Sequence, residues 1–197
     1  MKAFGLTGNI GCGKSTVASM LAKHSDIKII DCDKLAKEIM ASGIYKEEIN
    51  RIVGAEVFPG GFIDFKVIAK NIFSDTNKRQ LFEKLIHPLV WSAAEIIAAK
   101  ANRKIVVVES AIIFETKSSE MFQAMITVTC NKKEQFRRLQ QNRFMSNTEI
   151  KARIASQIPS KEKEKQSDFV IDTNCSLLNL ENRVNVLYQK LKERKEQ

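Results

Sequence analysis

The sequence is poor in several kinds of residue, and each shortage excludes a class of protein. Its 197 residues include only 4 cysteines, 2 histidines and 3 prolines. No two cysteines form a C-x-x-C pair and no histidine lies near them in the sequence, so neither a zinc site nor a disulfide framework is predicted. No uncharged stretch approaches the roughly 18 apolar residues that a membrane span needs. We therefore expect a soluble, cytoplasmic protein with no targeting segment and no membrane partner.

Aromatic residues are also scarce, which argues against a surface built to stack nucleic-acid bases. The chain has 1 tryptophan and 2 tyrosines, whereas single-strand binding platforms depend on such rings. Its formal charge is nevertheless +9, from 32 basic and 23 acidic residues. Much of the basic charge is mixed with glutamate in residues 132–143, 151–165 and 190–195, a pattern typical of solvated helix faces. A small polyanionic substrate explains this charge as well as nucleic acid does, and no nucleic-acid partner is predicted.

Short apolar stretches rich in β-branched residues predict strands, and segments with helical spacing separate them. The predicted strands are Lys2–Thr7, Ile27–Asp31, Lys104–Val108, Met125–Thr129 and Phe169–Ile171. Strands that alternate with helices favour an α/β fold with a mostly parallel sheet that is covered on both faces. The length of the chain suits one such domain.

The predicted helices fall between these strands and include one unusually long helical region. Residues 14–23 have an apolar face, and the stretch after Ser176, its expected N-cap, places apolar residues three and four positions apart. The segment from Lys34 to Arg103 is helical in pattern and, at about 70 residues, far exceeds an ordinary crossover. Pro88 is expected to break it, because proline disfavours a helical residue before it. We expect an insertion of this size to hold a ligand.

A glycine-rich stretch at residues 5–16, GLTGNIGCGKST, lies between the first predicted strand and a predicted helix. Gly8-x-x-x-x-Gly13-Lys14-Ser15 fits the P-loop pattern in the context that this motif requires. The glycines let backbone N–H groups approach phosphates, Lys14 adds a positive charge, and the Ser15 hydroxyl can ligate Mg²⁺. The sequence thus predicts a P-loop NTPase-type fold, with a parallel five-stranded sheet flanked by helices, and an ATP site with Mg²⁺ as cofactor. The predicted nucleotide contacts are Gly8, Gly11, Cys12, Gly13, Lys14, Ser15 and Thr16.

A small kinase is the P-loop class that remains after two others are excluded. No aspartate is followed by glycine three residues later and no Asn-Lys-x-Asp motif is present, so a GTPase is not predicted. A DNA-handling ATPase is ordinarily larger. Asp31 and Asp33 follow the second strand, at the edge where α/β sheets bind ligands. Asp33 is therefore a candidate general base for an acceptor hydroxyl, and its alternative role is that of a helix cap.

Basic residues after the fourth predicted strand are candidates for a lid. Arg137, Arg138 and Arg143 lie in a predicted helix, and Arg153 and Gln157 follow in the next. Such a helical pair can close over a nucleotide, where it brings cations to the γ-phosphate and excludes water.

Taken together, these segments give the whole chain a pattern that resembles the dephospho-CoA kinase family. The motifs are GLTGNIGCGKST, IIDCDKLAKEI, RQLFEKLIHPLV, RRLQQNR with ARIASQ, and SDFVIDTN. The resemblance implies that Asp33 is the catalytic base and that Lys14 and Arg143 act on the transferring phosphate. It also implies acceptor binding by Asp33, Arg79, His87 and Gln157, and places Asn174 and Arg143 at the ATP. Two positions depart from the family pattern, since Ala111 replaces the usual proline in SAIIFE and Cys12 stands where serine is commoner.

The resemblance further implies a reaction and a domain organisation. The reaction is ATP-dependent phosphorylation of the ribose 3′-hydroxyl of dephospho-CoA, which yields CoA and ADP in the last step of coenzyme A synthesis. One domain is expected, with a core at residues 1–33, 104–131 and 168–197, an acceptor-binding insertion at 34–103 and a lid at 132–167. Two alternatives stay open: another small-molecule P-loop kinase, for a nucleoside monophosphate or a sugar acid, and a non-enzymatic nucleotide-sensing or nucleic-acid-binding module. No oligomeric state is predicted.

Overall fold

The computed structural model describes residues 1–102, 104–143 and 146–195, without the side chains of residues 142 and 143. The chain divides into two compact units, one made of residues 1–31 and 97–197 and the other of Cys32–Ile96. None of the helices in the described ranges combines the length and the apolarity that crossing a bilayer requires.

The larger unit is built on a parallel sheet of five strands in the order β2-β3-β1-β4-β5. The strands are β1 (Phe4–Thr7), β2 (Ile27–Asp31), β3 (Ile105–Glu109), β4 (Ala124–Thr129) and β5 (Phe169–Asp172). Each neighbouring pair is parallel. The predicted α/β class and all the predicted strands are confirmed, with small shifts of their ends.

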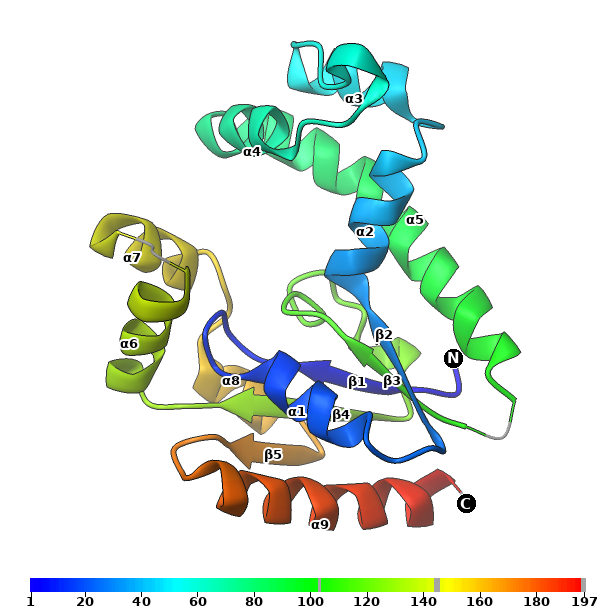
Figure 1. Ribbon diagram of the computed structural model, residues 1–197, viewed down its shortest axis with the longest axis vertical. Helices are drawn as coiled ribbons and strands as arrows, with labels where there is room; N and C mark the ends of the chain where they lie inside the picture. Colours follow the sequence, from blue (N-terminus) through cyan, green and yellow to red (C-terminus); the bar gives the residue numbers. More distant parts are fainter. Residues whose placement is uncertain (103, 144–145, 196–197) are drawn as a thin grey trace. The chain divides into compact units, whose positions relative to one another are not determined.

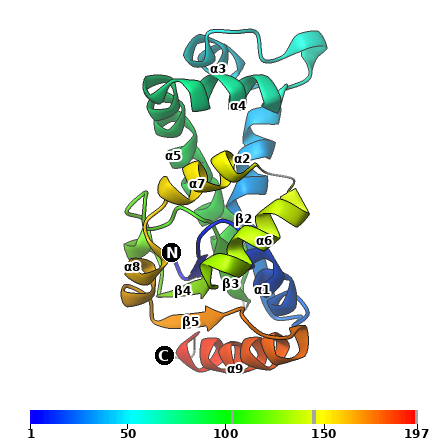
Figure 2. The ribbon, with the colours of Figure 1, turned by 90° about the vertical axis from the view of Figure 1, so that its left-hand side faces the viewer.

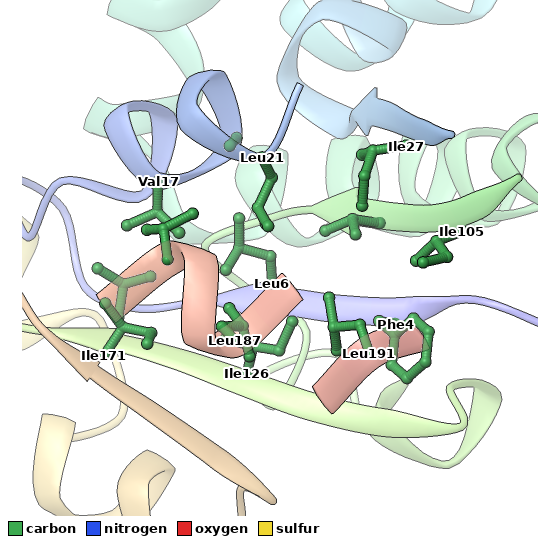
Figure 3. Close-up of a cluster of buried hydrophobic side chains, with 14 of the residues drawn as sticks. Phe4, Leu6, Val17, Leu21, Ile27, Ile105, Ile126, Ile171, Leu187 and Leu191 are labelled. Atoms are coloured by element: carbon green, nitrogen blue, oxygen red, sulfur yellow. The ribbon is translucent and has the colours of Figure 1, made fainter. Parts of the chain in front are cut away.

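Helices cover both faces of this sheet, as continuous apolar strands require. Helices α1 (Lys14–Leu21) and α9 (Leu177–Lys195) pack against each other over one face (Figure 1). In Figure 3 their side chains, among them Val17 and Leu187, extend toward strand residues such as Leu6. Helix α8 (Ser160–Lys165) packs against β4. It lies on the opposite face, because its Lys163 carbonyl contacts Thr127, whereas the neighbouring Ile126 faces the α1–α9 core.

The register of the strands brings chemically important residues to one edge. Glu109 at the end of β3 is aligned with Leu6 of β1 and with Asp31 of β2. Thr7, the last residue of β1, is aligned with Thr127 of β4. The loop that follows β1 therefore leaves the sheet beside the carboxyl ends of β3 and β4, where α/β proteins bind their ligands.

Three helices follow one another between β4 and β5 (Figure 2). They are α6 (Lys132–Arg143), α7 (Asn147–Ala155) and α8. Helix α7 starts where the sequence supplies a capping box, in which Ser146 and Glu149 each accept a backbone N–H of the other. Helix α9 begins after Ser176, whose hydroxyl accepts the N–H of Asn179 at 3.3 Å, so the predicted N-cap is confirmed.

The smaller unit is helical. Its helices are α2 (Cys32–Ala41), α3 (Lys46–Val53), α4 (Phe65–Ser74) and most of α5 (Thr76–Lys100). Asp64 begins α4 by accepting the N–H groups of Lys66 and Val67 at 2.8 and 3.2 Å, as an N-cap residue does.

The predicted helix break at Pro88 is wrong, because α5 runs through it. A proline inside a helix removes one backbone hydrogen bond and costs about 3 kcal/mol. Phe82, Ile86 and Val90 are buried at four-residue spacing along one side of α5, on both sides of the proline. Burial of a large apolar side chain contributes about 1.5–3 kcal/mol, so this stripe outweighs the local cost of Pro88.

Candidate active site

The loop after β1 has the backbone that a P-loop needs. Gly8 has a φ of 145°, and a Cβ atom there would lie 2.2 Å from the carbonyl oxygen of Val128. Gly13 has a φ of 91° and forms the N-cap of α1 in the left-handed region, which favours glycine. The loop is thus pressed against the end of β4 and leads directly into a helix N-terminus that can receive an anion.

Replacing Gly8 with alanine is expected to disrupt this packing. The added Cβ overlaps the Val128 carbonyl, so steric overlap and backbone strain together should lower the free energy of unfolding by about 3 kcal/mol. Gly60→Ala is the matched control, because its φ of 63° is also positive but nothing lies within 4 Å of the added Cβ. We expect it to cost only about 1 kcal/mol. Equal losses in urea denaturation of the two variants would contradict the close packing at Gly8.

Lys14 and Ser15 are held by specific contacts. The Lys14 ammonium donates a hydrogen bond to the Gly8 carbonyl at 3.0 Å, so it lies across its own loop. The Ser15 hydroxyl donates to Glu109 Oε1 at 2.9 Å, and Glu109 is buried at the end of β3. A cation and a hydroxyl–carboxylate pair therefore stand at the same loop, as phosphate and metal handling require.

The oxygen groups at this loop fit Mg²⁺. The ion prefers oxygen ligands and usually keeps several waters, with only one or two protein ligands beside substrate phosphates. Ser15 with Glu109 supplies such a small donor set, and Asp31 is aligned with Glu109 in the sheet. No group of three or more acidic, cysteine or histidine side chains suited to a metal occurs among the described residues.

A pocket of 490 Å³ opens beside the P-loop. Its walls come from the P-loop with the start of α1, from α6, from the segment that joins β5 to α9, and from the first turn of α9. The lining residues are Gly11, Gly13, Lys14, Ser15, Thr16, Glu134, Arg137, Arg138, Leu139, Thr173, Cys175, Leu177 and Leu180. Cations gather near the loop and apolar side chains line the side toward α9, which matches a ligand with a polyanionic end and an apolar end.

Arg138 links α6 to the segment between β5 and α9, which also lines this pocket. Its guanidinium donates to the hydroxyl and to the carbonyl of Thr173 at 2.8 and 3.0 Å. The Thr173 hydroxyl is also 2.9 Å from the carbonyl of Cys12, to which it donates. Hydrogen bonds from Arg137 and Arg138 lower the pKa of Glu134 to about 2. Arg138 is therefore a cation fixed within reach of the P-loop backbone.

Gln157 and Asn174, both predicted site residues, bind backbone groups of neighbouring loops. Gln157 Oε1 accepts the N–H of Ile10 in the P-loop at 2.9 Å. Asn174 Oδ1 accepts the N–H of Asn131, just before α6, at 3.0 Å. Gln157 thus fastens the end of the α6–α7 region to the P-loop in this structure, and Asn174 joins the loops after β4 and β5.

The buried ion pair between Lys163 and Glu115 lies next to the contact between Gln157 and Ile10. The Lys163 ammonium is fully buried, 2.7 Å from Glu115 Oε1 and 2.8 Å from the Ala111 carbonyl. Burial lowers the pKa of Lys163, although Glu115 acts in the opposite direction. Glu115 also accepts the N–H of Ile158 at 3.0 Å. Lys163 therefore connects α8, the loop after β3 and the chain next to Gln157.

The remaining predicted site residues belong to the smaller unit. Asp33 lies in the first turn of α2. Arg79, Glu83 and His87 follow one another at four-residue spacing in α5, and thus share one side of that helix. Arg79 Nε is 3.6 Å from Glu83 Oε1. Burial lowers the pKa of His87, although Glu83 acts in the opposite direction, so His87 is neutral near pH 7.

Arg143, the predicted lid cation, ends α6, and its side chain lies outside the described residues. Sequence reasoning missed Glu109, Thr173 and Lys163. The signal for Glu109 was a carboxylate at the end of an apolar strand, beside the strand that carries the P-loop. Nothing in the local pattern marks Thr173 or Lys163, because their partners lie far away in the sequence.

Comparison with known proteins agrees with this geometry. The family model described as dephospho-CoA kinase matches residues 2–179. A dephospho-CoA kinase of Bdellovibrio bacteriovorus is 34% identical over 100% of both chains. One of Arabidopsis thaliana is 32% identical over 90% of this chain and 78% of its own. A solved structure, TT1252 from Thermus thermophilus, has a TM-score of 0.82 and 29% identity over 96% of this chain and 97% of its own. The chain therefore belongs to the dephospho-CoA kinase family, and it is a kinase.

Proposed function

We propose that this chain carries out the reaction that gives its family its name. It transfers the γ-phosphoryl group of ATP to the ribose 3′-hydroxyl of dephospho-CoA and yields CoA and ADP, the final step of coenzyme A biosynthesis. The observation that carries the proposal is a fully formed P-loop pocket in a chain that matches the family model over residues 2–179. Other small-molecule kinases share the P-loop, but the curated relatives at 30–34% identity are described as dephospho-CoA kinases, which does not favour another acceptor.

ATP is proposed to lie in the 490 Å³ pocket. Backbone N–H groups of Gly11 to Thr16 and the ammonium of Lys14 would bind the phosphates, because amides at a helix N-terminus and a fixed cation both favour an anion. The base would lie toward the apolar side chains of Cys175 and Leu177, which line the same pocket. Asn174, next to Cys175 in the sequence, is proposed to lie at the adenine.

Mg²⁺ is proposed as the metal cofactor, with Ser15 and Glu109 as the residues that would hold it. When bound, it neutralises charge on the phosphates. The chain's own contribution is the pair itself, since Glu109 orients the Ser15 hydroxyl at 2.9 Å. Arg138, fixed by Thr173, supplies a further positive charge on the α6 side of the pocket.

Residues 132–167 are proposed to be the lid. Four α6 residues line the pocket wall: Glu134, Arg137, Arg138 and Leu139. The end of the segment is anchored by the Gln157 contact to Ile10 and by the Lys163–Glu115 pair. Arg143 is proposed to act on the transferring group from this segment, as the family resemblance implies. A closed lid would exclude water from the transferring phosphate.

Asp33 is proposed to orient the 3′-hydroxyl and to take its proton as the oxygen attacks the γ-phosphorus and the bond to ADP breaks. Arg79 and His87 are proposed to bind the acceptor. The Arg79 side chain is 39% exposed and its Nε faces Glu83 at 3.6 Å, so a guanidinium N–H other than that of Nε is the donor proposed for an anionic group of the acceptor. Neutral His87, two helical turns away on the same side of α5, can donate or accept one hydrogen bond. Gln157 is proposed to reach the acceptor only when it releases Ile10.

The proposal is tested by ADP release with Mg²⁺-ATP and a panel of acceptors. We expect turnover with dephospho-CoA and none above the no-acceptor background with AMP, CMP, adenosine or gluconate. Turnover with AMP, CMP or gluconate and no turnover with dephospho-CoA would favour another small-molecule kinase. No turnover with any acceptor, together with salt-sensitive binding of nucleic acid, would favour a nucleic-acid-binding module instead.

A further inference from the structure

Two cysteines meet at the P-loop. The sulfur of Cys12, inside the loop, lies 3.3 Å from the sulfur of Cys130, which directly follows β4. Cys12 is buried, with 1% of its surface exposed, whereas Cys130 is half-buried and opens the pair to solvent. The four cysteines, all within the described residues, form no disulfide in this structure. The other two cysteines are not part of this pair. The Cys175 thiol donates a hydrogen bond to the Asp172 carbonyl, and Cys32 belongs to the smaller unit.

The surroundings of this pair favour a thiolate on Cys12. The hydrogen bond from Cys130 lowers the pKa of the Cys12 thiol to about 7, although burial acts in the opposite direction, and the charges of Lys14 and Arg138 add to the lowering. The same hydrogen bond raises the pKa of Cys130, which therefore keeps its proton. A thiolate beside a resolving thiol is the arrangement typical of reversible thiol oxidation.

We propose that Cys12 and Cys130 form a reversible disulfide on exposure to a hydroperoxide, and that this disulfide weakens ATP binding at the P-loop. The Cys12 thiolate attacks hydrogen peroxide, the O–O bond breaks, and a sulfenic acid and hydroxide result. The Cys130 thiol then attacks the sulfenic sulfur, the S–O bond breaks, and water leaves. The two sulfurs lose two electrons in total, the peroxide gains them, and, with one proton from solvent, two waters are released.

The disulfide must draw the loop toward β4. The two sulfurs have to close from 3.3 Å to about 2.05 Å, and both side chains already pack against the core cluster, so the backbone has to follow. The Cys12 carbonyl is bound by Thr173 at 2.9 Å, and this contact fixes the N–H groups that are proposed to bind phosphate. We therefore expect the disulfide to lower ATP affinity at least about 10-fold, the cost of one lost hydrogen bond to a charged group.

The experiment treats the whole protein with graded hydrogen peroxide. Free thiols are titrated, disulfide-linked peptides are mapped by mass spectrometry, and ATP affinity is measured by calorimetry before and after dithiothreitol. We expect loss of two thiols, a Cys12–Cys130 peptide, weaker ATP binding and recovery on reduction. The inference rests on the proposed binding of ATP at the P-loop, but the thiol titre and the peptide map report the disulfide even if ATP does not bind there.

Two variants provide the controls. Cys130→Ser should form no link and keep its ATP affinity through the treatment, because without the Cys130 thiol the disulfide that would draw the loop toward β4 cannot form. Cys32→Ser, which removes a thiol of the smaller unit, should behave like the unchanged protein. The proposal is overturned if no Cys12–Cys130 link forms while a reference dithiol is oxidised, if Cys175 is the partner found, or if Cys130→Ser loses as much affinity as the unchanged protein.

Discussion

Replacing Asp33 with asparagine is expected to lower kcat at least about 100-fold, the lower range for loss of a general base. The amide is nearly isosteric with the carboxylate but cannot take the proton of the 3′-hydroxyl. ATP affinity should stay the same, because the described residues that line the pocket beside the P-loop belong to the larger unit. Steady-state kinetics with dephospho-CoA and calorimetry with ATP measure the two quantities separately.

Asp64→Asn is the matched control for this prediction. Asp64 also lies at a helix N-terminus of the smaller unit, where it accepts two backbone N–H groups, and asparagine is an equally good N-cap. Its kcat should therefore be unchanged. If Asp33→Asn also turned over at a near-normal rate, Asp33 would be a helix cap and not the base.

Replacing Lys163 with methionine is expected to destabilise the larger unit strongly. The lysine is fully buried and bonds Glu115 and the Ala111 carbonyl. Methionine keeps most of the side-chain volume but leaves the Glu115 carboxylate without its counter-charge. Breaking a buried ion pair in this way costs about 3–5 kcal/mol. Urea denaturation followed by circular dichroism measures the loss.

Lys161→Met separates this effect from loss of any lysine in α8. The Lys161 side chain is 85% exposed and pairs with Glu164 at 3.1 Å, and surface pairs of this kind contribute about 0–1 kcal/mol. Adding Glu115→Gln to the Lys163→Met variant should restore part of the stability, because the uncompensated charge disappears. Stability of Lys163→Met within about 0.5 kcal/mol of the unchanged protein, the range of ordinary surface substitutions, would refute the structural role of this pair.

The parts of the fold that sequence predicts here are those that local pattern determines. The strands are short and apolar, and the P-loop follows one of them directly, so the sheet and the phosphate site could be located without coordinates. Pro88 shows the limit of local rules. The free-energy cost of the proline falls on one helical turn, whereas the buried apolar side chains from Phe82 to Ala94 stabilise α5 on both sides of it.

The connections within the site could not be predicted, because they join residues distant in sequence. Ser15 and Glu109 are 94 residues apart, and Ile10 and Gln157 are 147 apart. Gln157 illustrates the consequence. Family resemblance assigns it to the acceptor, but only the fold shows that its side chain binds the P-loop backbone. The close approach of Cys12 and Cys130 has the same origin, since β1 and β4 pair in parallel and end at the same edge.

The proposed reaction is tested most directly by identifying its two products and measuring the amount of each. Mg²⁺-ATP and dephospho-CoA are incubated with the protein, ADP and CoA are quantified by liquid chromatography with mass spectrometry, and the position of the new phosphate is read by phosphorus NMR. The proposed reaction predicts one CoA for each ADP, with the phosphate on the ribose 3′-oxygen. ADP without CoA, or a phosphate at another position, would contradict it.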